Sequence, residues 1–594
     1  MTTNWIERIS EKCKPHSKSL VPLLFLLNVV LIFPVFFPNL SDIGPWDESR
    51  YINSGRGLID AGLLQQYAWN PLLSFFYALI YIPIKSTTFW LIHSCTIGRF
   101  ILFGLMWLSA YFVAKQLSFL SHPLIMIGIL LSSPALTYLL ANPSDALFVA
   151  MSAFALWQVL SFYNEKKIKH LWLASLFVGL SALARNDGLI LFFSLIILAV
   201  FLSMPIRRLG TALIASVIPF VIIVGGYVIL YGLKTGQFEF GTIRRTYVAF
   251  EQGQGFVYEY LYKGKNLATE GHIEAQRLFG TPEENQYSVI SAVRRNPKAF
   301  LDRVRQTVKS SPLKIYFMYG DRSGIIILFF ALMGAVEIVR KRLYLLFMIL
   351  FLWATHIFVY LLTFYRHTYF LLPYFVVFVF ASVGLSFILY HMNKKRLYFW
   401  TILLLALALL GIMTNRPNVF SATLIFLMGL WIIKIIVNRY QGYEAIKPVA
   451  IILTICLLLL LKVSYPSPKF RRLGIAPDER AALFMREHLA PGSRVLSYTP
   501  GNVWVAKMRH DIFDYNFRSI SDQHLSTSIA KVIKAVYVDD TLRRDEPILW
   551  KKIEKMVGKG LEVGFKSDDG EIQVLLVNKT ALSPQTCSMK CHHS

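Results

Sequence analysis

The chain has 594 residues, of which 55% are hydrophobic and only 16% are charged, and its mean hydropathy is +0.50. Soluble globular proteins carry about 25% charged residues, so this composition excludes an ordinary soluble enzyme. Apolar runs long enough to cross about 30 Å of hydrocarbon recur along most of the sequence. The composition therefore predicts a polytopic α-helical membrane protein.

The net charge of +26 does not indicate a nucleic-acid-binding protein. Much of the positive charge lies in short clusters between hydrophobic segments, where Lys and Arg set the orientation of membrane spans. The sequence contains no basic helix or basic–aromatic array of the kind that binds nucleic acid. We expect no nucleic-acid partner.

The N-terminal segment 1–19 is polar and basic, and an apolar run begins at Leu20. No small-residue cleavage site follows this run, which is therefore interpreted as a retained signal anchor. Residues 70–84 are either a further span or an interfacial helix. Thirteen spans are predicted: 20–37, 90–114, 123–140, 145–163, 169–184, 188–204, 210–231, 323–339, 343–363, 368–390, 398–414, 418–437 and 448–464.

Charge asymmetry supports this count. With the N-terminus in the cytoplasm, the inside segments hold eighteen Lys and Arg residues, and the short outside loops hold six. Cytoplasmic loops of membrane proteins show such an excess. The pattern predicts a cytoplasmic segment 1–19, a transmembrane domain 20–464 and an extracytoplasmic domain 465–594. The transmembrane domain includes two large outer loops, 38–89 and 232–322, and we expect a bacterial inner membrane rather than the endoplasmic reticulum.

The C-terminal region reads as a small α/β domain. The stretch "PDERAALFMREHL" predicts a helix opened by Pro477 and Asp478 and stopped by "APG". Four β-rich stretches, "SRVLSY", "AVYVDD", "LEVGF" and "IQVLLV", predict strands with helical patterns between them. The region has no glycine-rich phosphate fingerprint, so no nucleotide is assigned to it.

Two of the five cysteines, Cys587 and Cys591, lie close to the C-terminus. They could pair in an oxidising compartment. The alternatives are two free thiols, or part of a small metal site with His592 and His593, which the lack of a CxxC pair disfavours.

Ionisable groups gather in the loops predicted to lie outside. "PWDESRYIN" holds Asp47 and Glu48, and "NPSD", "ARNDG" and "FYRHTYFLLP" follow at the outer ends of later spans. Charged groups at the membrane edge that all open to one side indicate a single polar cavity. A carboxylate there can act as a general base, and arginine can bind a phosphate through two parallel hydrogen bonds. This combination suits transfer of a group from a lipid phosphate.

Each of these residues also has a structural interpretation. The aspartate of the first outer loop and Asp145 are good helix N-terminal residues. Glu48 is a second acid, a group that orients its neighbour, or a cation ligand. Arg99 lies inside a predicted span, where it either snorkels or needs a partner. Arg185 and Asp187 are expected to pair with each other more readily than to bind a ligand.

The order of these motifs resembles that of the GT-C glycosyltransferases. A first span is followed by "WDESRY", "NPLL", "IGRFILFGL", "NPSDALFVA", "LARNDGLILF" and "YRHTYFLLPYFVVF". The resemblance is to the glycosyltransferase family 39 type, which includes protein O-mannosyltransferases and the lipid A aminoarabinose transferase. It implies a polyprenyl- or dolichyl-phosphate sugar donor and a reaction on the outer or lumenal side.

The resemblance also implies roles for single residues, with two departures from the family pattern. His367 replaces the usual tyrosine after Arg366, and "WNPLL" lacks the basic residue proposed to contact the lipid phosphate. The implied catalytic residues are Asp47, Glu48 and Asp145. The implied donor-phosphate residues are Arg366, His367, Arg99, Arg245, Arg244 and Lys85. The implied substrate-binding residues are Tyr51, Arg50 and Arg185.

These observations predict an inverting membrane glycosyltransferase with a polyprenyl-phosphate-linked sugar donor and a glycan, lipid or protein acceptor. The alternatives are a transporter or flippase of lipid-linked sugars, and a non-catalytic partner in envelope assembly. No metal site is assigned, although the two adjacent acids of the first outer loop could hold a divalent cation.

Overall fold

The computed structural model describes residues 25–26, 29, 36, 48–62, 71–120, 134–203, 209–236, 238, 240, 243–262, 267–319, 324–358, 360, 369, 371–391, 401–402, 405, 427–429, 431, 435, 477–498, 501–512 and 522–578. Seven residues singled out as candidates in the sequence fall outside this set: Asp47, Arg366, His367, Cys587, Cys591, His592 and His593. The spans predicted after residue 392 also fall almost entirely outside it.

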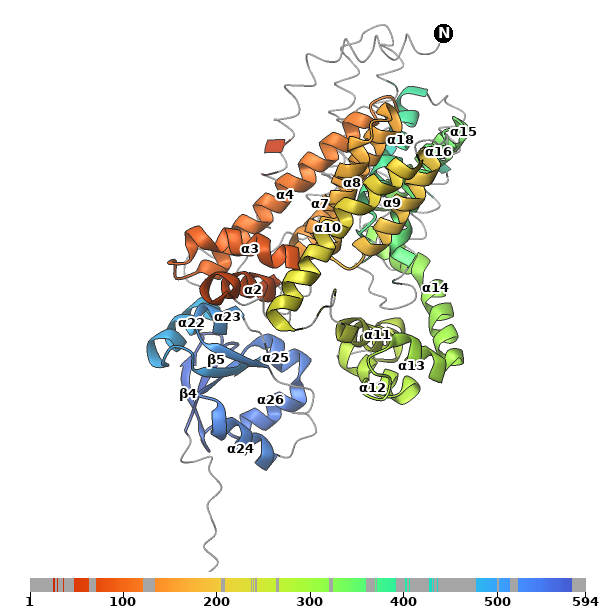
Figure 1. Cartoon of the computed structure of the whole chain (residues 1–594). Coiled ribbons are helices and arrows are strands. Elements are labelled where there is room, and N and C mark those ends of the chain that lie inside the picture. The colour runs from red at the N-terminus through yellow and green to blue at the C-terminus, as the bar shows by residue number, and fades with distance from the viewer. Residues whose placement is uncertain are drawn as a thin grey trace, which may run out of the picture.

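Long apolar helices form a bundle (Figure 1). They are α4 (Trp90–Gln116), α6 (Pro134–Ala141), α7 (Pro143–Glu165), α8 (Lys169–Ala184), α9 (Gly188–Leu202), α10 (Leu209–Thr235), α15 (Gly324–Arg340), α16 (Tyr344–Ala354), the short η4 (Thr355–Ile357) and α18 (Tyr374–His391). For each longer helix, at least one end lies within two residues of the corresponding end of a predicted span. Within the described residues, α4, α7 and α10 are long and apolar enough to cross a membrane. The total of thirteen spans stays a prediction.

Helix α7 occupies the centre of the bundle. Nearly all its side chains are buried, including small residues on every face, as expected for a helix that is apolar all round and packed on all sides. Its C-terminal Asn164 donates a hydrogen bond of 3.0 Å to the Gln116 side chain at the end of α4. The two helices therefore run parallel, and the start of α7 lies at the same end of the bundle as the start of α4.

A serine compensates for the proline inside α10. Pro219 cannot donate a backbone hydrogen bond, so it interrupts the ladder of α10. The hydroxyl of Ser175, on α8, donates to the Ser216 carbonyl at 2.6 Å and accepts from the Phe220 amide at 3.1 Å. One side chain thus satisfies backbone groups near the proline and joins α8 to α10.

Two shorter helices lie across one end of the bundle (Figure 1). They are α2 (Glu48–Ala61) and α3 (Pro71–Ile84). They pack closely because Gly55 of α2 sits against the backbone of α3: an added Cβ would lie 2.6 Å from the Ala78 nitrogen. Lys234, at the end of α10, donates to the Gly62 carbonyl at 3.0 Å and fixes the far end of α2. We call this the α2 end of the bundle.

The segment between α10 and α15 folds into a helical module with its own core. Its helices are α11 (Ile243–Val257), η3 (Glu259–Leu261), α12 (Leu267–Phe279), α13 (Val289–Arg295) and α14 (Pro297–Tyr319). The core centres on Tyr247, Phe250 and Phe279. The segment 232–322, predicted as a long outer loop, thus contains helices that pack around a core of their own.

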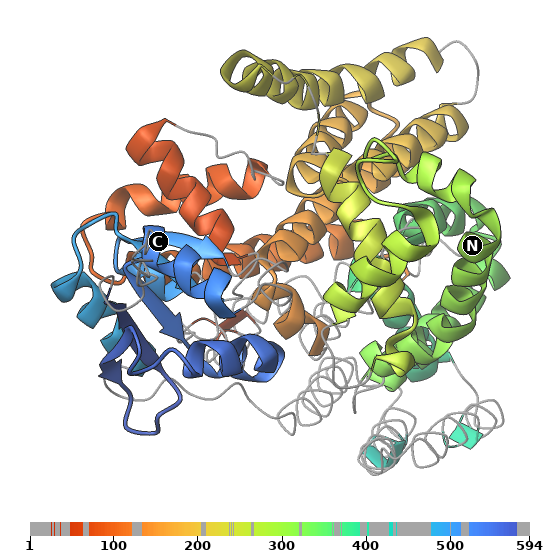
Figure 2. The ribbon, with the colours of Figure 1, turned by 90° about the horizontal axis from the view of Figure 1, so that it is seen from below.

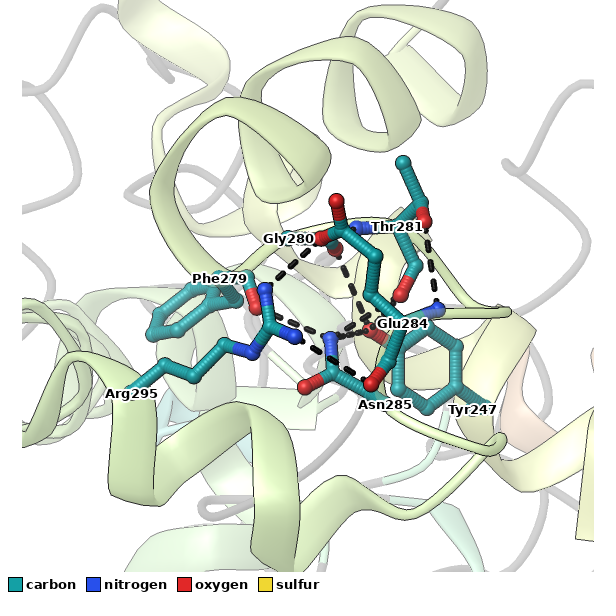
Figure 3. A network of polar contacts seen from close by, with 7 residues as sticks. All are labelled: Tyr247, Phe279, Gly280, Thr281, Glu284, Asn285 and Arg295. Atoms are coloured by element: carbon teal, nitrogen blue, oxygen red, sulfur yellow. Dashed lines mark hydrogen bonds and ion pairs between the residues drawn. The ribbon is translucent and has the colours of Figure 1, made fainter.

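A polar network closes the turn between α12 and α13 (Figure 3). The Asn285 amide donates to the Tyr247 hydroxyl and to the Phe279 carbonyl, both at 2.8 Å. Burial raises the pKa of Tyr247, so its hydroxyl stays protonated. Glu284 accepts from the Thr281 amide at 3.0 Å and pairs with Arg295 at 2.7 Å. These bonds replace regular secondary structure and hold the turn in one conformation.

The C-terminal region contains a five-stranded sheet in the order β2-β1-β3-β5-β4. The strands are β1 (Arg494–Ser497), β2 (Arg509–Ile512), β3 (Ala535–Val538), β4 (Leu561–Lys566) and β5 (Gln573–Val577). Strands β2, β1 and β3 are parallel, and β5 is antiparallel to both β3 and β4. The accompanying helices are α22 (Pro477–His488), α23 (Gly501–Val505), α24 (Asp522–Val532), α25 (Asp540–Asp545) and α26 (Pro547–Glu554).

The sequence predicted β1, β3, β4, β5 and α22 at these places and missed β2. Strand β2 reads "RHDI", which has no apolar alternation, and it forms the edge of the sheet beside β1. Pairing with β1 makes it a strand, which a local pattern cannot reveal.

This sheet domain contacts the bundle through α23. Val505 and Ala482 belong to the same buried apolar cluster as the bundle helices, and Trp504 packs against that cluster. Both the sheet domain and the α11–α14 module lie at the α2 end (Figure 1). Figure 2, seen from below, shows them beside each other.

Candidate functional site

A buried carboxylate anchors the start of α2. Glu48, the first residue of α2, is 1% exposed, and its Oε2 lies 2.7 Å from the Nη2 of Arg99 on α4. The Arg99 Nε also donates to Glu48 Oε1 at 3.2 Å. The Cys95 thiol donates to the same oxygen at 3.0 Å, and the Tyr77 hydroxyl lies 3.5 Å away. We call these four residues the Glu48 anchor.

The Glu48 anchor depends on a glycine. The ring of Tyr77 lies directly over Gly98, where an added Cβ would be 2.6 Å from the ring. The phenol can therefore reach the carboxylate from α3. A buried ion pair is held only with good geometry and further hydrogen bonds. Here α3 and α4 supply both.

Asp47 directly precedes α2 and lies outside the described residues. Its neighbour Glu48 is fixed to two helices, so the peptide that leads into α2 is anchored at one end. Both oxygens of Glu48 accept hydrogen bonds within the protein. The role of Glu48 toward Asp47 stays a prediction.

A second cluster of charges joins the ends of three bundle segments. Arg185, between α8 and α9, pairs through Nη1 with Asp145 at the start of α7 and through Nε with Asp187, 2.8 Å away. Its Nη2 donates to the Tyr360 hydroxyl at 2.8 Å, and that hydroxyl donates to Asp187. The guanidinium also lies 4.9 Å from the ring centre of Tyr369. We call these five residues the Arg185 cluster.

The predicted pairing of Arg185 with Asp187 is confirmed. The link to Asp145, forty residues away, was not anticipated, and neither were Tyr360 and Tyr369. The two tyrosine rings stack at 4.2 Å. Tyr360 sits in a run of aromatic and apolar residues, so its sequence carries no signal that separates it from membrane packing.

A buried histidine, His356, lies four residues before Tyr360 of the Arg185 cluster. The Nδ1 of His356, in η4, is 2.9 Å from the Trp353 carbonyl, and its ring meets Phe148 of α7 edge-on at 5.5 Å. The Trp353 indole donates to the Ser152 carbonyl of α7 at 3.2 Å. His356 is not among the residues predicted from the sequence.

The remaining candidates are dispersed. Tyr51 is buried in α2, Arg50 is half-buried on the same helix, and Lys85 is exposed after α3. Arg244 and Arg245 belong to the first turn of α11. Their assigned roles stay predictions.

The described residues offer no cluster of metal ligands. Among them, no three His, Cys, Asp or Glu side chains lie close enough together to hold a metal ion. Glu48 fits poorly as a ligand because Arg99 already neutralises its carboxylate. A divalent cation beside Asp47 stays an untested prediction.

The fold is shared with solved membrane enzymes. ArnT from Cupriavidus metallidurans in the apo state aligns with a TM-score of 0.54 and 13% identity, over 96% of this chain and 100% of that chain. The same protein bound to undecaprenyl phosphate aligns with a TM-score of 0.56 and 12% identity, over 96% and 99%. The chain has the GT-C fold. The GT-C resemblance seen in the motifs is thereby confirmed at the level of the fold, and the apolar helices of the described bundle agree with an integral membrane protein.

Other comparisons add little to the GT-C assignment. The archaeal oligosaccharyltransferase AglB from Archaeoglobus fulgidus aligns with a TM-score of 0.49 and 14% identity, over 96% of this chain and 75% of that chain. No protein-family model and no curated protein matches the sequence. At 12–13% identity the GT-C likeness establishes the fold, and the chemistry has to be argued from this chain's own residues.

Proposed function

We propose that this chain is a membrane glycosyltransferase. It moves a sugar from a polyprenyl-phosphate-linked donor to a glycolipid, glycan or protein acceptor on the outer face of the membrane. The observation that carries the proposal is a GT-C fold over 96% of the chain, with two buried acid–arginine clusters built into it. One of the similar structures holds undecaprenyl phosphate, which is chemically the leaving group assigned here.

The proposed reaction is a single displacement. The acceptor hydroxyl oxygen attacks the anomeric carbon from the face opposite the lipid phosphate, and its proton passes to the carboxylate of Asp47. The bond from the anomeric carbon to the phosphate oxygen breaks, and the configuration inverts. Arg366 binds the departing phosphate, which is a weak base and needs a cation rather than an acid. An acceptor that is already anionic needs no base, and Asp47 then only orients it.

The two clusters have positioning roles in this proposal. The Glu48 anchor fixes the helix that follows Asp47, and the Arg185 cluster ties the start of α7 to the α8–α9 turn and to Tyr360. Alignment of reacting groups supplies much of the rate of a displacement, and loss of 1 Å of precision can reduce it about 100-fold. Arg99 and Arg185 are thereby reassigned from substrate contacts to residues that hold carboxylates.

The competing function is a transporter or flippase of a lipid-linked sugar. It would bind the same head group, but it needs charged groups that become accessible from both sides. In the described bundle, the acid–arginine contacts of both clusters involve the first residue of α2, the start of α7 and the α8–α9 turn, all at the α2 end. A non-catalytic assembly partner, docked through the sheet domain, is the third alternative.

The test is sugar transfer by purified protein from radiolabelled polyprenyl-phosphate sugars, with wild type compared with Asp47→Asn. We expect turnover by the wild type and at least a 100-fold lower rate in Asp47→Asn with donor binding retained. Asp60→Asn is the matched control, because Asp60 lies on the same helix at its exposed end and bonds Tyr81. Donor binding without turnover by any form, with every acceptor offered, would favour a flippase or an assembly partner.

A further inference from the structure

We propose that His356 contacts the sugar of the bound donor, through a hydrogen bond from a sugar hydroxyl to its Nε2. This inference rests on the proposed glycosyltransferase function and assigns a sugar-contacting residue within it. The starting point is a buried polar atom. His356 is 2% exposed, and among the described residues its Nε2 has no hydrogen-bond partner.

The hydrogen bond at the other ring nitrogen defines what Nε2 can do. Nδ1 lies 2.9 Å from the Trp353 carbonyl oxygen, which can only accept. The proton of the neutral imidazole therefore sits on Nδ1, and Nε2 presents a lone pair. The ring cannot turn over without losing this bond and its packing on Phe148. Nε2 is thus a hydrogen-bond acceptor in a fixed position, and no donor in the described residues reaches it.

An unpaired acceptor inside a protein costs free energy, so the unpaired Nε2 needs an explanation. The surroundings supply one. Tyr360 follows His356 by four residues; it hydrogen-bonds Arg185 and Asp187 and stacks with Tyr369 beside the Arg185 guanidinium. Acceptor groups for hydroxyl donors thus adjoin flat aromatic faces that can cover the C–H groups of a ring. Ligand sites combine apolar and aromatic lining with a few fixed polar groups in this way.

The location agrees with this role. Trp353 donates to the Ser152 carbonyl of α7, and Phe148 of the same helix contacts the imidazole. His356 is therefore fixed to α7, the helix whose first turn holds Asp145 of the Arg185 cluster. Nε2 is buried, so the proposal requires neighbouring side chains to move when the sugar enters. In the proposed mechanism the phosphate is bound by Arg366 and not by His356.

Two substitutions separate a ligand contact from a structural role. His356→Asn keeps a donor where Nδ1 lies, so the bond to Trp353 persists and the acceptor is lost. His356→Gln places its amide oxygen near the position of Nε2 and gives up the bond to Trp353. A structural residue tolerates Asn better than Gln, whereas a sugar acceptor shows the opposite order. His170→Asn is the matched control, because His170 is a buried histidine whose partners are Gln158 and Glu165 on α7.

The experiment measures binding of two probes to the full chain in detergent, at matched folded fraction. The probes are undecaprenyl phosphate alone and undecaprenyl phosphate carrying the sugar that the wild type transfers. We expect His356→Asn to weaken binding of the sugar-bearing lipid about five- to tenfold, as for one neutral hydrogen bond, and to leave the bare lipid phosphate unchanged. His356→Gln and His170→Asn should keep the wild-type preference for the sugar.

Equal weakening of both probes by His356→Asn, or no weakening of either, overturns the proposal. If His356→Asn does not fold, His356→Gln decides alone: loss of its sugar preference also overturns it. A wild-type protein that binds neither probe, or binds without transfer, contradicts the proposed function itself and not the assignment of His356 within it.

Discussion

At the scale of single residues, the two acids of the first outer loop differ in what surrounds them. Glu48 is enclosed by α3 and α4, and its carboxylate is neutralised by Arg99 and bonded by Cys95. Both of its oxygens already accept hydrogen bonds within the protein, so they are not free to bind an acceptor hydroxyl or a metal ion. Asp47 is therefore the better candidate for the chemical step, and adjacency in sequence does not make the two acids a catalytic pair.

Glu48→Gln should destabilise the protein by about 3 kcal/mol, because it leaves Arg99 buried without its counter-charge. The measurement is thermal or denaturant unfolding in detergent. The double variant Glu48→Leu with Arg99→Met should recover most of the loss, since apolar residues often replace buried ion pairs without cost. Glu165→Gln is the control, because Glu165 forms an exposed pair with Lys167. A Glu48→Gln protein of full stability but no activity would instead assign Glu48 to the chemistry.

At the scale of helices, close backbone approach decides the packing of α15 against α18. Gly334 and Gly384 face each other, and an added Cβ on Gly384 would overlap the Phe330 carbonyl oxygen. Small residues at such crossings let membrane helices associate through tight van der Waals contact. The sequence shows two glycines in apolar helices, and only their pairing reveals the interface.

Gly384→Ala should separate α15 from α18 and lower stability by at least 2 kcal/mol, because backbone atoms cannot move aside locally. Gly226→Ala is the matched control: it lies within α10, and no atom lies within 4 Å of the added Cβ. The control should be neutral or slightly stabilising, as alanine is the better helix former by about 1 kcal/mol. Unfolding curves of both variants in one detergent test this, and equal curves would contradict the interface.

At the scale of the whole molecule, the sheet domain is held against the bundle by a small apolar contact. Val505 of α23 is 2% exposed and shares a cluster with bundle residues, together with Ala482 and the partly buried Trp504. The parallel strand β1 leads into α23, so its carboxyl end points toward the bundle. The sheet domain and the α11–α14 module then lie at the end where the reaction is proposed (Figure 1).

Val505→Asp should release the sheet domain, because burial of an unpaired carboxylate costs several kcal/mol. Limited proteolysis is expected to separate the domain from the bundle more than tenfold faster than in the wild type. Val563→Asp is the control, since Val563 is 49% exposed on β4. A proteolysis rate of Val505→Asp equal to that of the control would contradict docking through α23. Sugar transfer by the released form would show whether docking is needed for activity.

The sequence by itself determined the membrane class, the positions of the described bundle helices, four of the five strands and the pairing of Arg185 with Asp187. These features depend on local composition, on periodicity and on groups two residues apart. Each can therefore be recognised within a short stretch of the sequence. The GT-C resemblance came from the order of several such windows.

Only the tertiary structure decided which side chains meet across the chain. Glu48 reaches Arg99 over 51 positions, and Arg185 reaches Tyr360 over 175. Strand β2 exists because β1 pairs with it, and His356 matters because a carbonyl fixes one nitrogen and leaves the other unpaired. These features depend on packing between distant segments, and the energy of such contacts does not appear in any local pattern.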